Sequence, residues 1–207
     1  MERSTTWAVV GGAVLGLGVI ATVAMVMLNQ RPTDFGCSGA AVGGSLGGPF
    51  TLVDENGATV TDRDVITAPT VVYFGYTFCP DVCPMDSQRN AFALEDLEDR
   101  GILANALFIT IDPERDTPEV VRDFTDSFHD RMLGLTGSPE QVREAAQAYR
   151  VFYSRDDSGG NSDFYLMNHS TFTYFATPDS GFVDVFSRET TPEQMADRIA
   201  CFVEAGA

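Results

Sequence analysis

Hydrophobic and polar residues alternate along the chain in blocks that predict a sheet flanked by helices. Three apolar runs rich in β-branched and aromatic residues, Thr70–Phe74, Ala104–Ile111 and Thr171–Phe175, have the composition of strands, and the first that of a strand buried on both faces. Between these runs apolar residues recur at helical spacing, and Ser or Thr before Pro marks helix starts. The predicted helices are 83–100, 119–128, one that opens at 138, and one from 191 to about 204.

Two segments have the pattern of β-hairpins. Apolar runs 49–53 and 58–60 flank Asn56-Gly57, the strongest short turn signal, and the strand 171–175 is followed by a turn and a partner strand 182–186. Three shorter predictions complete the order, namely strands at 132–135 and 151–153 and a polar, Gly-rich loop at 154–161. The pattern therefore predicts an α/β fold with an N-terminal β-hairpin and a terminal one.

The N-terminal segment is apolar and uncharged from Trp7 to Leu28. This run is about long enough to cross ~30 Å of hydrocarbon as a helix, so we interpret it as a transmembrane anchor. A cleaved signal peptide is the alternative, since 21–24 contains small residues. The predicted organisation is a tail and anchor (1–31), a Gly-rich tether (32–48) and a folded domain (49–207).

The chain is strongly acidic, with a net charge of −17 and only Arg among its 13 Lys and Arg residues. This balance argues against nucleic acid or an anionic membrane surface as a partner. Arg3 and Arg31 flank the predicted span and barely discriminate its orientation. Because only a short tail precedes the span, we place the folded domain outside the cytoplasm, in a bacterial periplasm.

Four cysteines allow three disulfide pairings. Cys37 follows the predicted anchor and Cys201 lies near the C-terminus, so these two can link the ends of the folded domain in an oxidising compartment. We favour this pairing because Cys79 and Cys83 have a better explanation.

Cys79 and Cys83 lie between the end of the predicted buried strand and the start of the following helix. Pro84 lies at the start of that helix. The positive end of a helix dipole favours the thiolate, which is both the nucleophile and the metal ligand. A strand, a loop with two cysteines and a helix form the active-site arrangement of thioredoxin-like proteins, although here three residues rather than two separate the cysteines. Two unrelated buried structural cysteines are the alternative.

His169 directly precedes the strand 171–175. In a thioredoxin-like sheet the loop that enters this strand packs beside the loop with the cysteines. Two thiolates and one imidazole suit Cu(I), whereas structural zinc normally takes four ligands. A hydrogen-bonded surface histidine is the alternative reading of His169. His129, at a predicted helix end, receives no ligand role.

Three segments, YFGYTFCPDVCPMD, ITIDPERDTPE and NHSTFTYF, closely resemble the Sco/SenC family of cytochrome c oxidase assembly proteins over roughly 47–202. The resemblance implies a thioredoxin-like central sheet flanked by helices, and copper, Cu(I) or Cu(II), bound by Cys79, Cys83 and His169. It further implies delivery of copper to the CuA centre of oxidase subunit II, or reduction of that centre's cysteines. Other periplasmic copper chaperones and thioredoxin-like reductants are further expected partners.

Two residues outside the ligand set matter for this resemblance. Asp112, in the DPERD run, is expected to stabilise the metal ligands without binding the metal itself, or to help a partner dock. The alternative is that Asp112 only belongs to a turn and helix cap. Asn168 departs from the family pattern, in which Asp commonly precedes the histidine. This change affects the basicity of the histidine without removing it as a ligand.

The resulting hypothesis is a chaperone anchored in the bacterial inner membrane, a metal-transfer protein rather than an enzyme. In an enzymatic alternative, Cys79 and Cys83 are the redox-active pair of a thiol–disulfide reductase. A peroxiredoxin-like peroxidase and a redox or copper sensor are the remaining alternatives. In the chaperone hypothesis a mobile segment, 154–168, moves His169 in and out.

Overall fold

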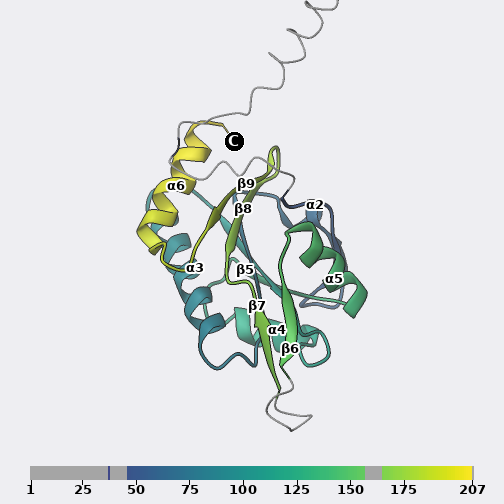
Figure 1. Ribbon diagram of the computed structural model, residues 1–207. Coiled ribbons are helices and arrows are strands. Elements are labelled where there is room, and N and C mark those ends of the chain that lie inside the picture. Colours follow the sequence, from purple (N-terminus) through teal and green to yellow (C-terminus); the bar gives the residue numbers. More distant parts are fainter. Residues whose placement is uncertain (1–36, 38–45, 157–164, 207) are drawn as a thin grey trace, which may run out of the picture. The chain divides into compact units, whose positions relative to one another are not determined.

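The structure, a computed structural model, describes residues 37, 46–156 and 165–206 (Figure 1). The chain divides into two units, Met1–Asp34 and Phe35–Ala207, and every described residue belongs to the second. The predicted span 7–28 and most of the predicted tether 32–48 lie outside the described residues. Within the described part, no helix combines the length and the apolar character that a membrane crossing needs.

The described unit is built on a seven-stranded mixed sheet with the order β2-β1-β5-β4-β3-β8-β9. The strands are β1 (Thr51–Asp54), β2 (Thr59–Thr61), β3 (Thr70–Gly75), β4 (Asn105–Thr110), β5 (Met132–Thr136), β8 (Thr173–Thr177) and β9 (Gly181–Phe186). β3 pairs parallel to β4 and antiparallel to β8, and all its residues are buried, as the continuous apolar run predicts. Both predicted hairpins, β1–β2 and β8–β9, are confirmed.

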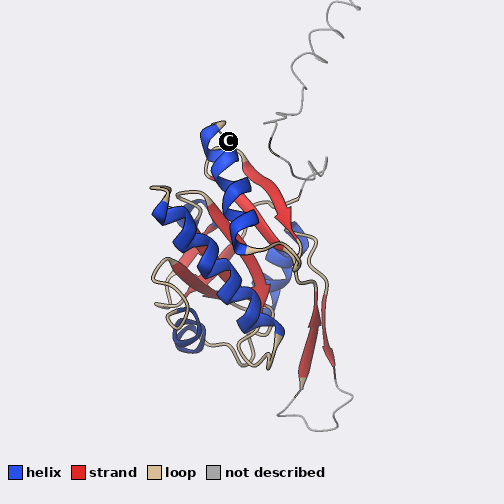
Figure 2. Ribbon diagram, turned by 90° about the vertical axis from the view of Figure 1, so that its left-hand side faces the viewer, coloured by secondary structure: helices blue, strands red, loops and turns tan. Residues whose placement is uncertain are grey.

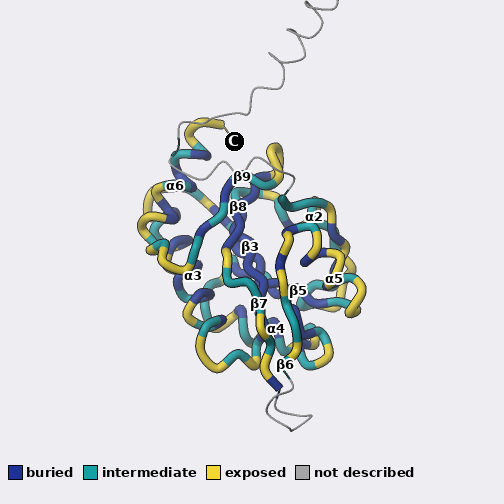
Figure 3. The backbone as a smooth tube through the Cα atoms, viewed as in Figure 1, coloured by how far each residue is buried: buried dark blue, intermediate teal, exposed yellow. Residues whose placement is uncertain are grey.

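Helices cover both faces of this sheet. They are α2 (Asp62–Val65), α3 (Val82–Asp99), α4 (Pro118–Thr125), α5 (Pro139–Ala148) and α6 (Pro192–Glu204). Figure 2 shows α3 and α6 side by side over one face. There Leu94 and Ile199 belong to one apolar cluster with Val71 and Phe175 of the sheet. On the other face Tyr149, just after α5, packs its ring 5.4 Å from that of Phe74. The central strands are therefore buried between two layers (Figure 3).

Three helices start as their sequences predict. Thr117, Ser138 and Thr191 are N-caps whose hydroxyls accept from the backbone N–H three residues on, and Pro follows each of them. These caps satisfy backbone groups that a helix start otherwise leaves unpaired. Local chemistry therefore fixes where α4, α5 and α6 begin.

A second, two-stranded sheet was not predicted. β6 (Tyr153–Asp156) pairs antiparallel with β7 (Leu166–His169), and we call this pair the arm. A strand was predicted at 151–153 and a loop at 154–161, but β6 spans Tyr153–Asp156. The prediction was therefore right at 153 and wrong at 151–152 and 154–156, and β7 was missed; 157–161 lies outside the described residues. Much of the arm is polar, so it lacks the apolar alternation that marks a half-buried strand. Figures 1 and 2 show the arm extending away from the seven-stranded sheet.

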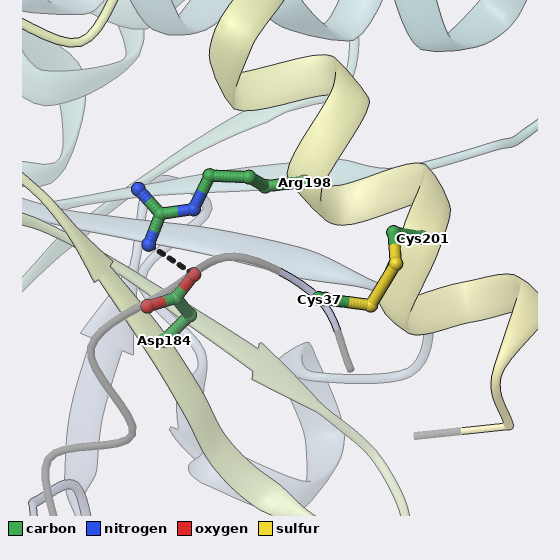
Figure 4. Close-up of a disulfide and its surroundings, with 4 residues drawn as sticks. All are labelled: Cys37, Asp184, Arg198 and Cys201. Carbon is green, nitrogen blue, oxygen red and sulfur yellow. Dashed lines mark hydrogen bonds and ion pairs between the residues drawn. A yellow bond between two sulfur atoms is a disulfide. The ribbon is translucent and has the colours of Figure 1, made fainter. Parts of the chain in front are cut away.

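A disulfide joins Cys37 to Cys201 on α6, which confirms the favoured pairing (Figure 4). It links residues 164 positions apart whose Cα atoms lie 5.9 Å from each other. In the same region Asp184 of β9 is buried and ion-paired with Arg198 of α6. The last helix is thus fixed both to the sheet and to the start of the folded unit.

Candidate metal centre

Cys79, Cys83 and His169 come together from three different segments. Cys79 lies in the loop after β3, Cys83 is the second residue of α3, and His169 is the last residue of β7. The Nε2 atom of His169 lies 3.4 Å from the sulfur of Cys83, and one possible ligand atom from each of the three residues lies within 4.8 Å of the others. The sequence thus predicted a convergence that the folded chain has, although His169 ends a strand of the arm rather than lying in a loop.

Asp116 holds the loop that carries Cys79. Its carboxylate accepts hydrogen bonds from the backbone N–H of Thr77 (3.0 Å), the hydroxyl of Thr77 (2.6 Å) and the hydroxyl of Thr110 (2.5 Å). Burial raises the pKa of Asp116, and these hydrogen bonds oppose the rise. The start of the cysteine loop is therefore tied to the end of β4 through a side chain 39 positions away.

The two cysteines differ in their electrostatic surroundings. The hydrogen bond from Cys83 lowers the pKa of Cys79 to about 4, helped by backbone N–H groups of Asp81, Val82 and Cys83 at the start of α3. The same hydrogen bond, together with burial, raises the pKa of Cys83. Cys79 is half-buried and Cys83 is fully buried. The arrangement thus places a thiolate near the surface and a thiol behind it.

The imidazole of His169 is oriented by its neighbours. Its Nδ1 lies 2.8 Å from the carbonyl oxygen of Ser170. A carbonyl only accepts hydrogen bonds, so we assign the proton to Nδ1, which leaves the lone pair of Nε2 directed at the sulfur of Cys83. The rings of Tyr73 and Tyr76 stand edge-on to the imidazole, with centroids 6.3 and 6.0 Å away. His169 therefore has the tautomer and the orientation of a metal ligand.

Gly75 is a residue of this site that the sequence analysis missed. A Cβ atom at Gly75 would lie 3.0 Å from the sulfur of Cys83, 2.8 Å from Tyr73 and 3.0 Å from Phe108. The absent side chain therefore makes the space that the buried sulfur fills. The available signal was a glycine at the end of a buried apolar strand, which indicates a close approach at that point.

Tyr73 and Asp86 form a buried pair behind the site that was also missed. The hydroxyl of Tyr73 donates to Asp86 at 3.0 Å, and both residues are almost fully buried. Asp86 in turn lies 3.7 Å from Arg89 and 3.5 Å from Arg188. These contacts fix the tyrosine ring that borders His169. An aromatic residue in an apolar strand gives no sequence signal of such a role.

Asp112 and His129, the other two residues considered in the sequence analysis, lie outside the cluster of candidate ligands. Asp112 is buried and accepts from Nε of Arg115 (2.5 Å) and from the hydroxyl of Tyr165 (2.6 Å). His129 accepts from the backbone N–H of Arg131 through Nδ1, and its Nε2 lies 3.8 Å from Glu98. The metal cluster found among the described residues does not include His129.

The chemistry of the donor set fits a soft, low-coordinate metal ion. Two sulfurs and one imidazole nitrogen within a few ångströms match the ligands that Cu(I) prefers, and the described cluster lacks the fourth donor of a structural zinc site. The same two sulfurs are close enough to act as a redox pair. No cis peptide bond occurs among the described residues, so the described part of the site lacks the cis-proline of thioredoxins.

Comparisons with known proteins agree on one family. A family profile described as SCO1/SenC matches residues 39–204. Protein SenC of Rhodobacter capsulatus is 45% identical over 208 residues, which cover 99% of this chain and 92% of that protein. By contrast, the chain covers 52% of the human mitochondrial SCO1 homologue and 46% of one from Arabidopsis thaliana.

Solved structures give the same fold. Yeast Sco1 with copper bound superposes with a TM-score of 0.73 at 36% identity, over 79% of this chain and 91% of that one. The copper-bound ScoI of Bradyrhizobium japonicum gives a TM-score of 0.67 at 37% identity, over 75% of this chain and 98% of that one. The thioredoxin-like fold expected from the sequence is confirmed.

Proposed function

Because this chain belongs to the SCO1/SenC family, we propose that it is a copper chaperone that binds Cu(I) through Cys79, Cys83 and His169. The observation that carries the proposal is the 3.4 Å separation between Nε2 of His169 and the sulfur of Cys83. Copper is the cargo of this site, and two relatives of similar fold were solved with copper bound.

The unequal exposure of the ligands supports transfer by ligand exchange. Cys79 and His169 are partly exposed, whereas Cys83 is buried. An incoming thiolate from a partner reaches the metal on the side of Cys79 and His169, so these ligands exchange first and Cys83 releases the metal last. Cys79 is the stronger initial ligand, because its thiolate is already formed.

We propose the CuA centre of cytochrome c oxidase subunit II as the recipient, as the family resemblance implies. The predicted anchor at 7–28 would hold the domain at the periplasmic face of the bacterial inner membrane. Acidic surface charge favours a partner with a complementary basic surface and disfavours nucleic acid. Other periplasmic copper chaperones would supply the metal, and thioredoxin-like reductants would keep the cysteines reduced.

A thiol–disulfide reductase is the second candidate, and the unequal pKa values of the two cysteines favour it. The Cys79 thiolate attacks a disulfide in the partner and forms a mixed disulfide, releasing one partner thiolate. Cys83 then passes its proton to the partner thiolate already released and attacks the sulfur of Cys79, which releases the second partner sulfur as a thiolate and leaves a Cys79–Cys83 disulfide. Two electrons pass to the partner, and His169 is not required.

Substitution of the two histidines separates these functions. We expect His169→Ala to lower Cu(I) affinity by at least roughly tenfold, since one of three ligands is lost, while reduction of a model disulfide continues. His129→Ala removes an imidazole outside the site and should leave copper binding unchanged. Competition with a Cu(I) chelator and X-ray absorption on the reduced protein measure affinity and ligands. Unchanged affinity in His169→Ala would refute the proposed ligand set.

A further inference from the structure

Among the described residues, the two strands of the arm that carries His169 pair with each other and not with a strand of the seven-stranded sheet. At its base, the backbone N–H of Ser170 donates to Phe152 at 2.9 Å, and Tyr153 and Met167 pack partly against the core. These contacts close the base of the arm. They do not explain what fixes the other end of β7, where Tyr165 lies four positions before His169.

Tyr165, directly before β7, is held there by both its ring and its hydroxyl. The hydroxyl donates to the carboxylate of Asp112 at 2.6 Å, and only 6% of the residue is exposed. The guanidinium carbons of Arg115 and Arg155 lie 3.6 and 3.7 Å from the centre of the ring. Two guanidinium groups cannot occupy the same face of a ring at that distance, so the ring is sandwiched between two cations.

Arg115 connects this tyrosine to the cysteine loop. Its Nε donates to Asp112 at 2.5 Å and its Nη1 donates to the carbonyl oxygen of Tyr165 at 3.0 Å. The same guanidinium carbon lies 4.8 Å from the ring centre of Phe78, which directly precedes Cys79. One side chain therefore contacts the segment before β7, the loop after β4 and the cysteine loop.

We propose that Asp112, Arg115 and Tyr165 form a clasp that fixes the arm against the cysteine loop and so sets the position of His169 relative to Cys83. The three are positioning residues, because none of them is among the three candidate ligands. The role in copper binding rests on the function proposed above, whereas the mechanical role of the clasp does not. The clasp gives Asp112 a specific task in support of the site.

Tyr165→Phe tests the clasp with the least disturbance. The ring stays between the two guanidinium groups, and only the hydrogen bond to the buried carboxylate is lost. In the reduced, metal-free protein we expect backbone amides of 166–169 to exchange with solvent roughly tenfold faster, as loss of a hydrogen bond to a charged group implies. Amides of β3 should exchange as in the wild type.

Tyr153→Phe is the matched control. It removes a phenol hydroxyl from the same arm, and that hydroxyl makes no hydrogen bond within the described part of the chain. Its exchange rates should equal those of the wild type. Asp112→Asn is the second variant: its amide oxygen still accepts one hydrogen bond but it no longer carries a charge opposite Arg115, so exchange at 166–169 should again accelerate while β3 stays protected.

The copper-loaded protein provides the second readout. In Tyr165→Phe we expect a roughly tenfold lower Cu(I) affinity and a weaker nitrogen contribution in X-ray absorption, with both sulfurs retained. Unchanged exchange at 166–169, or equal acceleration in β3, would overturn the clasp. Faster exchange with unchanged copper ligands would overturn its role in positioning His169. If the wild type itself binds no copper, the proposed function fails, and the exchange data still decide whether the clasp exists.

Discussion

At the scale of single residues, Cys79 and Cys83 belong to the same motif but differ in ionisation: the surroundings of Cys79 favour the thiolate and those of Cys83 favour the thiol. Cys79 faces backbone N–H groups at the start of α3 and receives a hydrogen bond from Cys83. Cys83 is buried beneath it, where Gly75 leaves room for its sulfur. Position in the loop, rather than residue type, therefore decides which sulfur is ionised.

This difference predicts selective alkylation. With a pKa lowered to about 4, Cys79 is already a thiolate across the neutral range, so its reaction with iodoacetamide should be almost independent of pH between about pH 6 and about pH 9. An ordinary thiol would react about tenfold faster for each pH unit up to its pKa. Mass spectrometry of the reduced, metal-free protein should find Cys79 modified before Cys83. Faster modification of Cys83 would contradict the assignment, and the denatured protein is the control.

Gly75→Ala should disturb the metal site through packing. The added methyl group would lie within 3.0 Å of the sulfur of Cys83 and of two aromatic rings. We expect a loss of about 1–3 kcal/mol in the free energy of unfolding, measured with urea, together with weaker copper binding because the sulfur must move.

Gly134→Ala is the control for Gly75→Ala. Its Cβ atom would lie 2.9 Å from Val121 of α4, in another part of the sheet. It should cost a similar amount of stability but leave copper affinity unchanged. Equal loss of copper affinity in both variants would show that general destabilisation, rather than displacement of Cys83, is responsible.

At the scale of elements, a helix start that depends on neighbouring residues can be predicted from the sequence more readily than a strand that depends on a distant partner. The starts of α4, α5 and α6 follow from a capping Ser or Thr and the Pro behind it. The arm has no such local signal, and its strands are defined by pairing Tyr153 with His169 across the segment between them. Elements with a local cap or turn signal were predictable, including the hairpins β1–β2 and β8–β9, whereas the arm, which lacks such a signal, was not.

The cap of α6 allows a direct measurement of one local contribution. The hydroxyl of Thr191 accepts from the backbone of Gln194, whose side chain accepts in return from the backbone of Thr191. Thr191→Ala should lower the free energy of unfolding by about 1 kcal/mol. Thr190→Ala, one residue earlier and outside the capping box, should change it by less than about 0.5 kcal/mol. Equal effects of the two substitutions would show that the cap contributes nothing.

At the scale of the whole molecule, the disulfide and the net charge act on the described unit as a whole. The Cys37–Cys201 bond closes a loop of 164 positions, so it restricts the unfolded chain far more than any local contact does. The charge of −17 disfavours binding to polyanions.

Removal of this disulfide should destabilise the protein without changing the metal site. The double variant Cys37→Ser/Cys201→Ser should lose about 3–5 kcal/mol in the free energy of unfolding, on the chain-entropy account. Copper affinity should stay that of the wild type, since Cys79 and Cys83 remain. The control is wild-type protein in which the Cys37–Cys201 disulfide has been reduced. It should unfold at the same urea concentration as the variant. An unchanged midpoint in the variant would contradict the stabilising role.

The sequence by itself determined the parts of this protein that depend on neighbouring residues. The buried strand, the cysteine loop and the helix behind it are continuous in the chain, and apolar runs, Pro and capping residues act over a few positions. The motifs around Cys79, Asp112 and His169 were sufficient for the family as well. The three candidate site residues were named together from the sequence, and the fold brings their possible ligand atoms within 4.8 Å of one another.

Only the tertiary structure decided how those residues meet. The sulfur of Cys83 and the imidazole of His169 are 86 positions apart, and their 3.4 Å separation depends on an arm whose far end is held by Asp112, Arg115 and Tyr165. The need for glycine at position 75 likewise arises from atoms of other segments. Such contacts depend on packing between distant segments, which local propensity and periodicity do not encode.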